Sequence, residues 1–269
     1  MKGNGLVLIL LLVAAGIIVL TCGIWFYNAL RFHALPQMQN PISKIVSSTN
    51  TQSEGCALIP YVGTTSLDQL PSYDSGDEDF RGGMTCTFVI NPNLPAFTFR
   101  FAGNADNSLG NIDVTEGTSA AVIQTIENST DPGDIAPATS QDVLVPVDAN
   151  FDGYKDLRIL NECGATGNCS YDFYLYDPAT NRFVENSFLS NLSTPTFDEA
   201  KKQVTTDQNS SAADWESDTY QYENGKYVLV KEEISVWDRK TDMVTVTTSE
   251  LQDGKMEIVD ATTTPFSSM

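Results

Sequence analysis

Short runs of β-branched and aromatic residues, separated by turn residues, fill the chain from Gly55 onward and restrict its fold more than any other feature. Apolar and polar residues alternate with a period of two in TFRF, YDFYLY and VTVTTS. This period is typical of strands with one buried face. Roughly ten such runs can be recognised on this criterion. The sequence therefore predicts an all-β domain over 55–269.

Turn signals between these runs predict hairpins at ENGK, QDGK and DPATNR. Asn-Gly and Asp-Gly supply the positive φ angles that tight hairpins require. The only helix that the pattern suggests is a short one, Asp198 to Gln203. The strand number fits a small β-propeller, which we prefer, or a β-sandwich. No repeat of blade length is visible, so both architectures stay open.

The N-terminal segment from Gly3 to Leu30 carries no charged residue, and Leu6 to Tyr27 is almost wholly apolar. A helix of this length spans the roughly 30 Å hydrocarbon layer of a bilayer. We expect a membrane anchor over 1–30, followed by a flexible polar linker over 31–54. The flanking charges leave its orientation undecided. Lipidation or cleavage at Cys22 stays an alternative to an uncleaved anchor.

Four further cysteines lie in the predicted β domain, and their even number is typical of an exported, disulfide-bonded protein. Proximity in the sequence favours Cys56–Cys86 and Cys163–Cys169, although four cysteines allow three pairings. Reduced, buried cysteines in a cytosolic domain are the alternative. We expect a single-pass protein of the cell membrane, with its β domain in the periplasm or outside the cell.

The formal net charge is −20, from 35 acidic and 15 basic residues. This charge repels nucleic acid and anionic lipid headgroups, and it attracts cations or a basic protein. We therefore expect a basic protein partner, membrane contact through the N-terminal helix alone, and no binding of nucleic acid.

The stretch VDANFDGYKDLRIL places oxygen-bearing side chains at alternate positions around a glycine, as the first part of a calcium loop does. The predicted ligands, at positions 1, 3, 5, 7 and 9 of that loop, are Asp148, Asn150, Asp152, the Tyr154 main-chain carbonyl and Asp156. Position 12 holds Ile159 instead of a bidentate glutamate, so this is not an EF-hand. We expect weak binding of Ca²⁺, with a structural rather than a catalytic role. An Asx-rich turn without an ion is the alternative.

Another acidic stretch, Asp77 to Asp79, lacks this spacing and is interpreted as a solvated loop.

Four segments in a fixed order, DANFDGYKDLRIL, YDFYLYDPATNRFVEN, FLSNLSTPTFDEAKKQV and WESDTYQYENGKYVLV, resemble a bacterial family. Its members are exported, calcium-binding, propeller-like proteins, among them lysozyme-inhibiting immunity proteins that accompany type IV secretion effectors. The resemblance implies that a small-residue loop enters the cleft of a lysozyme-like hydrolase. The matching residues here are Ser210, Ser211 and Ala212, without the family's glycine. With Asn209, Trp215 and Glu216 the two serines form the predicted partner-binding loop; the alternative is that Trp215 packs under a hairpin and the serines cover a turn.

An enzymatic role is not expected. The single histidine, His33, lies beside the predicted anchor, so the β domain cannot build a Ser-His or Cys-His pair. A calcium-dependent adhesion or scaffold module that binds another protein or a glycan is the main alternative function. A glycosidase that uses a carboxylate pair is a weaker one.

Overall fold

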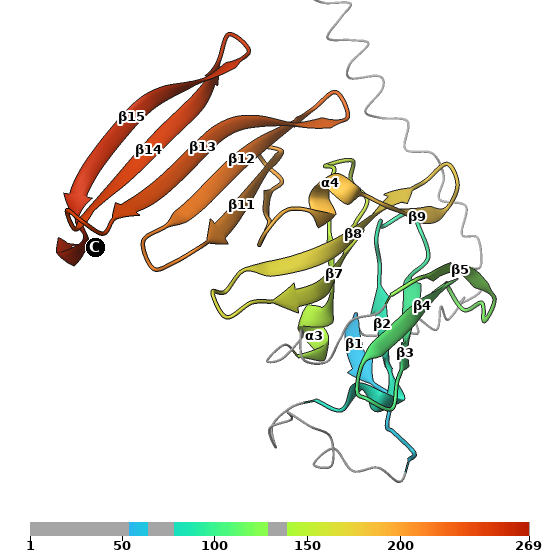
Figure 1. Ribbon diagram of the computed structural model, residues 1–269. Helices are drawn as coiled ribbons and strands as arrows, with labels where there is room; N and C mark the ends of the chain where they lie inside the picture. The colour runs from blue at the N-terminus through green and yellow to red at the C-terminus, as the bar shows by residue number, and fades with distance from the viewer. Residues whose placement is uncertain (1–53, 64–77, 129–138, 269) are drawn as a thin grey trace, which may run out of the picture. The chain divides into compact units, whose positions relative to one another are not determined.

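The computed structural model describes residues 54–63, 78–128 and 139–268, which all belong to the unit Thr51–Met269. Within these residues the protein consists of three antiparallel sheets, each with its strands in sequence order (Figure 1). The expected all-β class is therefore confirmed. A propeller arrangement of the sheets is not shown.

The first sheet has five strands, drawn in blue to green in Figure 1: β1 (Gly55–Leu58), β2 (Met84–Phe88), β3 (Phe97–Gly103), β4 (Leu109–Glu116) and β5 (Val122–Ile126). The second sheet has four: β6 (Leu144–Val147), β7 (Asp156–Cys163), β8 (Cys169–Asp177) and β9 (Arg182–Glu185). The third has six: β10 (Thr196–Asp198), β11 (Gln203–Asn209), β12 (Trp215–Glu223), β13 (Lys226–Asp238), β14 (Met243–Gln252) and β15 (Lys255–Pro265).

The three predicted hairpins are present as β8–β9, β12–β13 and β14–β15. In the ENGK turn, Asn224 and Gly225 have φ angles of 51° and 78°. Asp253 and Gly254 in the QDGK turn have φ angles of 51° and 80°. Glycine, asparagine and aspartate tolerate this left-handed region, so the local turn chemistry decides where the chain reverses.

The second sheet lies between two hydrophobic clusters, because alternate residues of β8 point to opposite faces. Tyr176 joins the larger cluster, where it packs edge-on against Phe97 of β3 at a ring-centroid distance of 5.7 Å. Phe173 joins the smaller cluster with Val204 of β11. The core thus runs from the first sheet through the second to the third.

The predicted helix over Asp198 to Gln203 is wrong. Asp198 ends β10, and a turn leads directly to Gln203 in β11. The described residues contain two short α-helices elsewhere, α3 (Ser140–Val143) and α4 (Ser187–Ser190). α4 starts where the Asn186 side chain accepts a hydrogen bond from the main-chain N–H of Leu189 at 3.0 Å, a side-chain cap that works over a single turn. α3 includes Asp142 and Val143, the first residues of the run DVLVPV, whose β-branched residues predict a strand.

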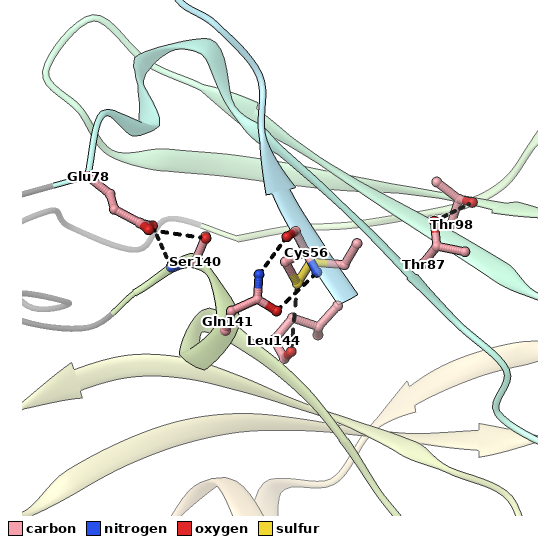
Figure 2. Close-up of a disulfide and its surroundings, with 8 residues drawn as sticks. Cys56, Glu78, Thr87, Thr98, Ser140, Gln141 and Leu144 are labelled. Carbon is pink, nitrogen blue, oxygen red and sulfur yellow. Dashed lines mark hydrogen bonds between the residues drawn. A yellow bond between two sulfur atoms is a disulfide. The ribbon is translucent and has the colours of Figure 1, made fainter. Parts of the chain in front are cut away.

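The solvated-loop interpretation of the second acidic stretch is also wrong for its two described members. Glu78 accepts a hydrogen bond from the main-chain N–H of Ser140 (Figure 2). Asp79 precedes the one-turn helix η2 (Phe80–Gly82) and forms a salt bridge of 2.7 Å with the buried Arg81. Glu78 therefore ties this stretch to the start of α3, 62 residues further along, and Asp79 fixes the chain locally, because a helix start and a buried guanidinium each need an acceptor.

Two disulfides join neighbouring strands at directly paired positions, Cys56–Cys86 and Cys163–Cys169. They are the pairs that sequence proximity favours. Gln141 of α3 holds the first of them in place, since its side chain donates to the Cys56 carbonyl at 2.6 Å (Figure 2).

The described part of the chain contains no helix with the length and apolar character needed to cross a membrane. The predicted anchor, nearly all of the predicted linker, Cys22 and His33 lie outside the described residues.

Candidate functional site

The predicted calcium loop connects β6 to β7 and curls around the carboxylate of Asp148. This carboxylate accepts main-chain hydrogen bonds from Asp152 and Gly153, both at 3.0 Å. Asp152 in turn accepts one from the N–H of Tyr154 at 2.9 Å. Gly153 has a φ of +88°, a conformation that a residue with a Cβ rarely adopts, so the tight curl depends on this glycine.

Asp156, the last predicted ligand, is completely buried. Its two oxygens accept hydrogen bonds from the main-chain N–H groups of Tyr176 at 2.8 Å and Ala149 at 2.9 Å. Burial raises the pKa of this carboxyl to about 7, although the two bonds act in the opposite direction. A carboxyl group that accepts hydrogen bonds at both oxygens is favoured in its ionised form. A nearby cation would stabilise that form further.

The chemistry of the other predicted ligands fits a hard cation in part. Burial raises the pKa of Asp148, and the charge of Asp152 raises it further. Among the described residues none of the three loop aspartates forms a salt bridge. Asn150 is turned toward Asp152, with its Nδ2 donating to Asp152 Oδ2 at 2.9 Å. The Tyr154 ring packs against Tyr176 at a centroid distance of 5.3 Å.

The loop is tied to residues outside its own sheet. Asn91, which follows β2, donates to the Gly153 carbonyl at 3.0 Å, and the N–H of Lys155 donates to the Ile90 carbonyl at 2.8 Å. From β13, the Tyr227 hydroxyl donates to the Ala149 carbonyl at 3.2 Å. An ion held by this loop would therefore brace contacts that reach all three sheets, which agrees with a structural role. Calcium binding itself stays a prediction.

The predicted partner-binding loop is a compact turn between β11 and β12. The Oγ of Ser211 donates to the Asp214 carboxylate at 2.8 Å and accepts from the Asp214 N–H at 3.0 Å. The buried Ala213 accepts from the Ser235 hydroxyl at 2.7 Å. Ser211 thus builds the turn. Ser210 is exposed, and its side chain makes no hydrogen bond within the described residues, so it is the serine available to a partner.

Trp215 and Glu216 lie on opposite faces of β12, because neighbouring residues of a strand alternate. Trp215 is paired with Ser235, and Glu216 is paired with Ile234. The two side chains therefore cannot contact one flat partner surface together. Trp215 is half-buried, whereas Glu216 is exposed.

Glu216 belongs to a carboxylate cluster that the sequence analysis missed. Oxygens of Glu216, Asp218 and Glu232 all lie within 4.8 Å of one another, and this is the only acidic group of that closeness in the described chain. The pKa of Glu216 is raised, first by burial and then by the charges of the other two. Asp218 also raises the pKa of Tyr220 to about 12, after burial, by accepting its hydroxyl at 2.9 Å.

A bulge explains why sequence spacing does not reveal this cluster. Counting back from the ENGK turn would place Asp218 opposite Lys231. The register shifts between Thr219 and Tyr220, and Asp218 instead faces Glu232. Like charges directly opposite each other in a sheet are destabilising. Folding alone does not favour such an arrangement.

No protein-family model matches the chain, and no curated protein matches it. Among solved structures, it is similar to a Xanthomonas protein described as type IV secretion system related. The identity is 20% and the TM-score 0.45, over 67% of this chain and 94% of that one. This likeness is distant.

Proposed function

We propose that this protein is an exported, calcium-stabilised β domain, tethered to the cell membrane, that binds and inhibits a basic, lysozyme-like peptidoglycan hydrolase. The role is one of binding, and none of its steps requires catalysis by this chain. The observation that carries it is the carboxylate cluster of Glu216, Asp218 and Glu232, two of whose members lie on β12, the strand that follows the exposed Ser210.

The cluster is suited to a positively charged partner. Three carboxylates held this closely repel one another, and a lysine or arginine placed among them relieves that repulsion. The net charge of −20 acts at longer range, since it would steer a basic protein toward this domain. The two disulfides support export to an oxidising compartment, where a hydrolase of the cell wall acts. The choice of a lysozyme-like enzyme comes from the sequence resemblance.

Inhibition of a panel of lysozymes and peptidoglycan hydrolases tests the proposal. The full-length chain, solubilised in detergent with calcium present, would be titrated into each enzyme while muramidase activity is followed. We expect stoichiometric inhibition of at least one basic enzyme. The triple variant Glu216→Gln/Asp218→Asn/Glu232→Gln should weaken it at least tenfold, because truncating a desolvated charge pair costs about 2–5 kcal/mol.

A matched control removes the same charge elsewhere on the third sheet. Glu223→Gln/Asp253→Asn/Glu257→Gln changes three exposed acids that lie outside the cluster. If both triple variants lose inhibition equally, net charge rather than the cluster governs binding. If no panel enzyme is inhibited by a chain that calcium still stabilises, the adhesion or scaffold function becomes the better account.

A further inference from the structure

A cavity of about 370 Å³ lies beside the partner-binding loop, between the start of β8 and the chain that follows α4. Residues of four segments line it, among them Glu162, Ser170, Ser193 and Gln208. Its volume falls in the range of protein ligand sites, roughly 300–1,000 Å³. We propose that this cavity binds an arginine side chain of the basic partner. The inference rests on the function proposed above and names the chemistry of one contact within it.

Two hydroxyl groups in the lining lack partners. The Oγ atoms of Ser170 and Ser193 are buried, and neither has a hydrogen-bond partner within the described residues. Buried polar atoms are nearly always hydrogen-bonded in native proteins. Two such atoms in residues that line one cavity would each gain an acceptor role if a polar ligand group displaced the atoms that now cover them.

The other polar groups of the lining also favour a ligand that only donates. Glu162 supplies a carboxylate, and the lining contains no lysine, arginine or histidine. Asn191 uses its Nδ2 to donate to the Ser187 carbonyl at 2.7 Å, which leaves its Oδ1 as an acceptor. A guanidinium group carries five donors, no acceptor and a permanent positive charge. A guanidinium group therefore matches the acceptors of this lining better than a neutral or an anionic ligand does.

The position of the cavity connects it to the surface already described. Gln208 is paired with Glu216 across β11 and β12, so their side chains are neighbours on one face of the third sheet. On the other side, Asn168 holds the main chain of Asn209 by two hydrogen bonds of 2.8 and 2.9 Å. One basic surface could therefore reach the cavity, the cluster and Ser210 together. Buried arginines of this kind are common anchors of protein interfaces.

Saturation-transfer NMR with two peptides tests the proposal independently of any hydrolase. The probes are acetyl-Gly-Arg-Gly-amide and the same peptide with citrulline, a neutral analogue of arginine, added to the full-length chain in detergent with calcium. We expect the arginine peptide to bind and the citrulline peptide to bind at least tenfold more weakly. Glu162→Gln and Ser193→Leu, which remove the carboxylate and fill the cavity, should each weaken binding of the arginine peptide at least tenfold.

Glu257→Gln serves as the matched control, since it removes one exposed charge distant in sequence from the cavity, and it should leave binding unchanged. Ser170→Ala/Ser193→Ala should melt no lower than the wild type, because it removes buried unpaired hydroxyls. Equal binding of both peptides, or unchanged binding after Ser193→Leu and Glu162→Gln, would overturn the inference. If arginine binding persists in these two variants but disappears in the cluster variant, the arginine sits at the cluster. That result rejects the cavity and leaves the proposed function standing.

Discussion

The carboxylate of Asp156 accepts a hydrogen bond from the main-chain N–H of Tyr176, twenty residues further along the chain. The same carboxylate also accepts a hydrogen bond from the main-chain N–H of Ala149, at the start of the acidic loop. One buried acid thus fixes the loop to two strands before any ion is considered.

Removal of this acid should destabilise the fold. Asp156→Ala leaves two buried N–H groups without acceptors, and each costs about 1–3 kcal/mol. We expect the free energy of unfolding to fall by about 3 kcal/mol in urea titrations with EGTA at pH 4.5, where Asp156 is protonated in the folded state and its ionisation costs nothing. Asp152→Ala is the control, because Asp152 is exposed, and it should change calcium affinity more than stability. An Asp156→Ala variant as stable as the wild type would contradict this assignment.

Stability without calcium should decrease as the pH rises from about 4 to 7. Burial raises the pKa of Asp156 in the folded protein to about 7, whereas in the unfolded chain it is about 3.9. Between these values the folded state keeps a proton that the unfolded state has lost, so raising the pH favours unfolding. The free energy of unfolding should fall by at most roughly 4 kcal/mol over this pH range. Thermal melting in EGTA at pH 4.5 and 7.5 measures it, with Asp156→Asn as the variant that should flatten the trend.

Calcium affinity should show the opposite dependence on pH. The ion binds the ionised loop, so protonation of Asp156 competes with it below about pH 7. We expect weaker binding at pH 5.5 than at pH 7.5 in calorimetric titrations. Affinity that is independent of pH over this range would show that Asp156 does not act as a ligand.

Loss of the two disulfides should have unequal effects. Cys56 and Cys86 are 30 residues apart in the chain, whereas Cys163 and Cys169 are 6 apart. The chain-entropy model gives about 3.7 kcal/mol for the longer loop and about 2.4 kcal/mol for the shorter. Denaturant unfolding of the two double Cys→Ala variants compares them. If removal of Cys163–Cys169 lowered stability more, side-chain packing around the disulfide rather than chain entropy would account for its contribution.

The two serines of the partner-binding loop should respond differently to substitution. Ser210→Trp adds bulk at an exposed side chain, so we expect stability within about 0.5 kcal/mol of the wild type and loss of hydrolase inhibition. Ser211→Ala removes hydrogen bonds of the turn and should cost about 1 kcal/mol. Urea titrations and muramidase assays on both variants separate the roles. Full inhibition by Ser210→Trp would exclude entry of this loop into a cleft.

Local patterns were sufficient for much of the fold. Period-two alternation predicts the strands because a half-buried strand needs it, and ENGK and QDGK predict hairpins because their residues tolerate positive φ angles. The short helix α4 was missed because a single turn is too short to show helical periodicity. Its start depends on one capping side chain, Asn186.

The sequence by itself determined the strand class, the hairpin turns and the curl of the acidic loop, because each depends on residues close together in the chain. Only the tertiary structure decided that Asp156 is buried against Tyr176 and that Ser211 is committed to its turn. It also decided the carboxylate cluster, because one bulge moves Asp218 from Lys231 to Glu232. A register shift of one residue is invisible to local propensity, yet it exchanges every cross-strand partner beyond it.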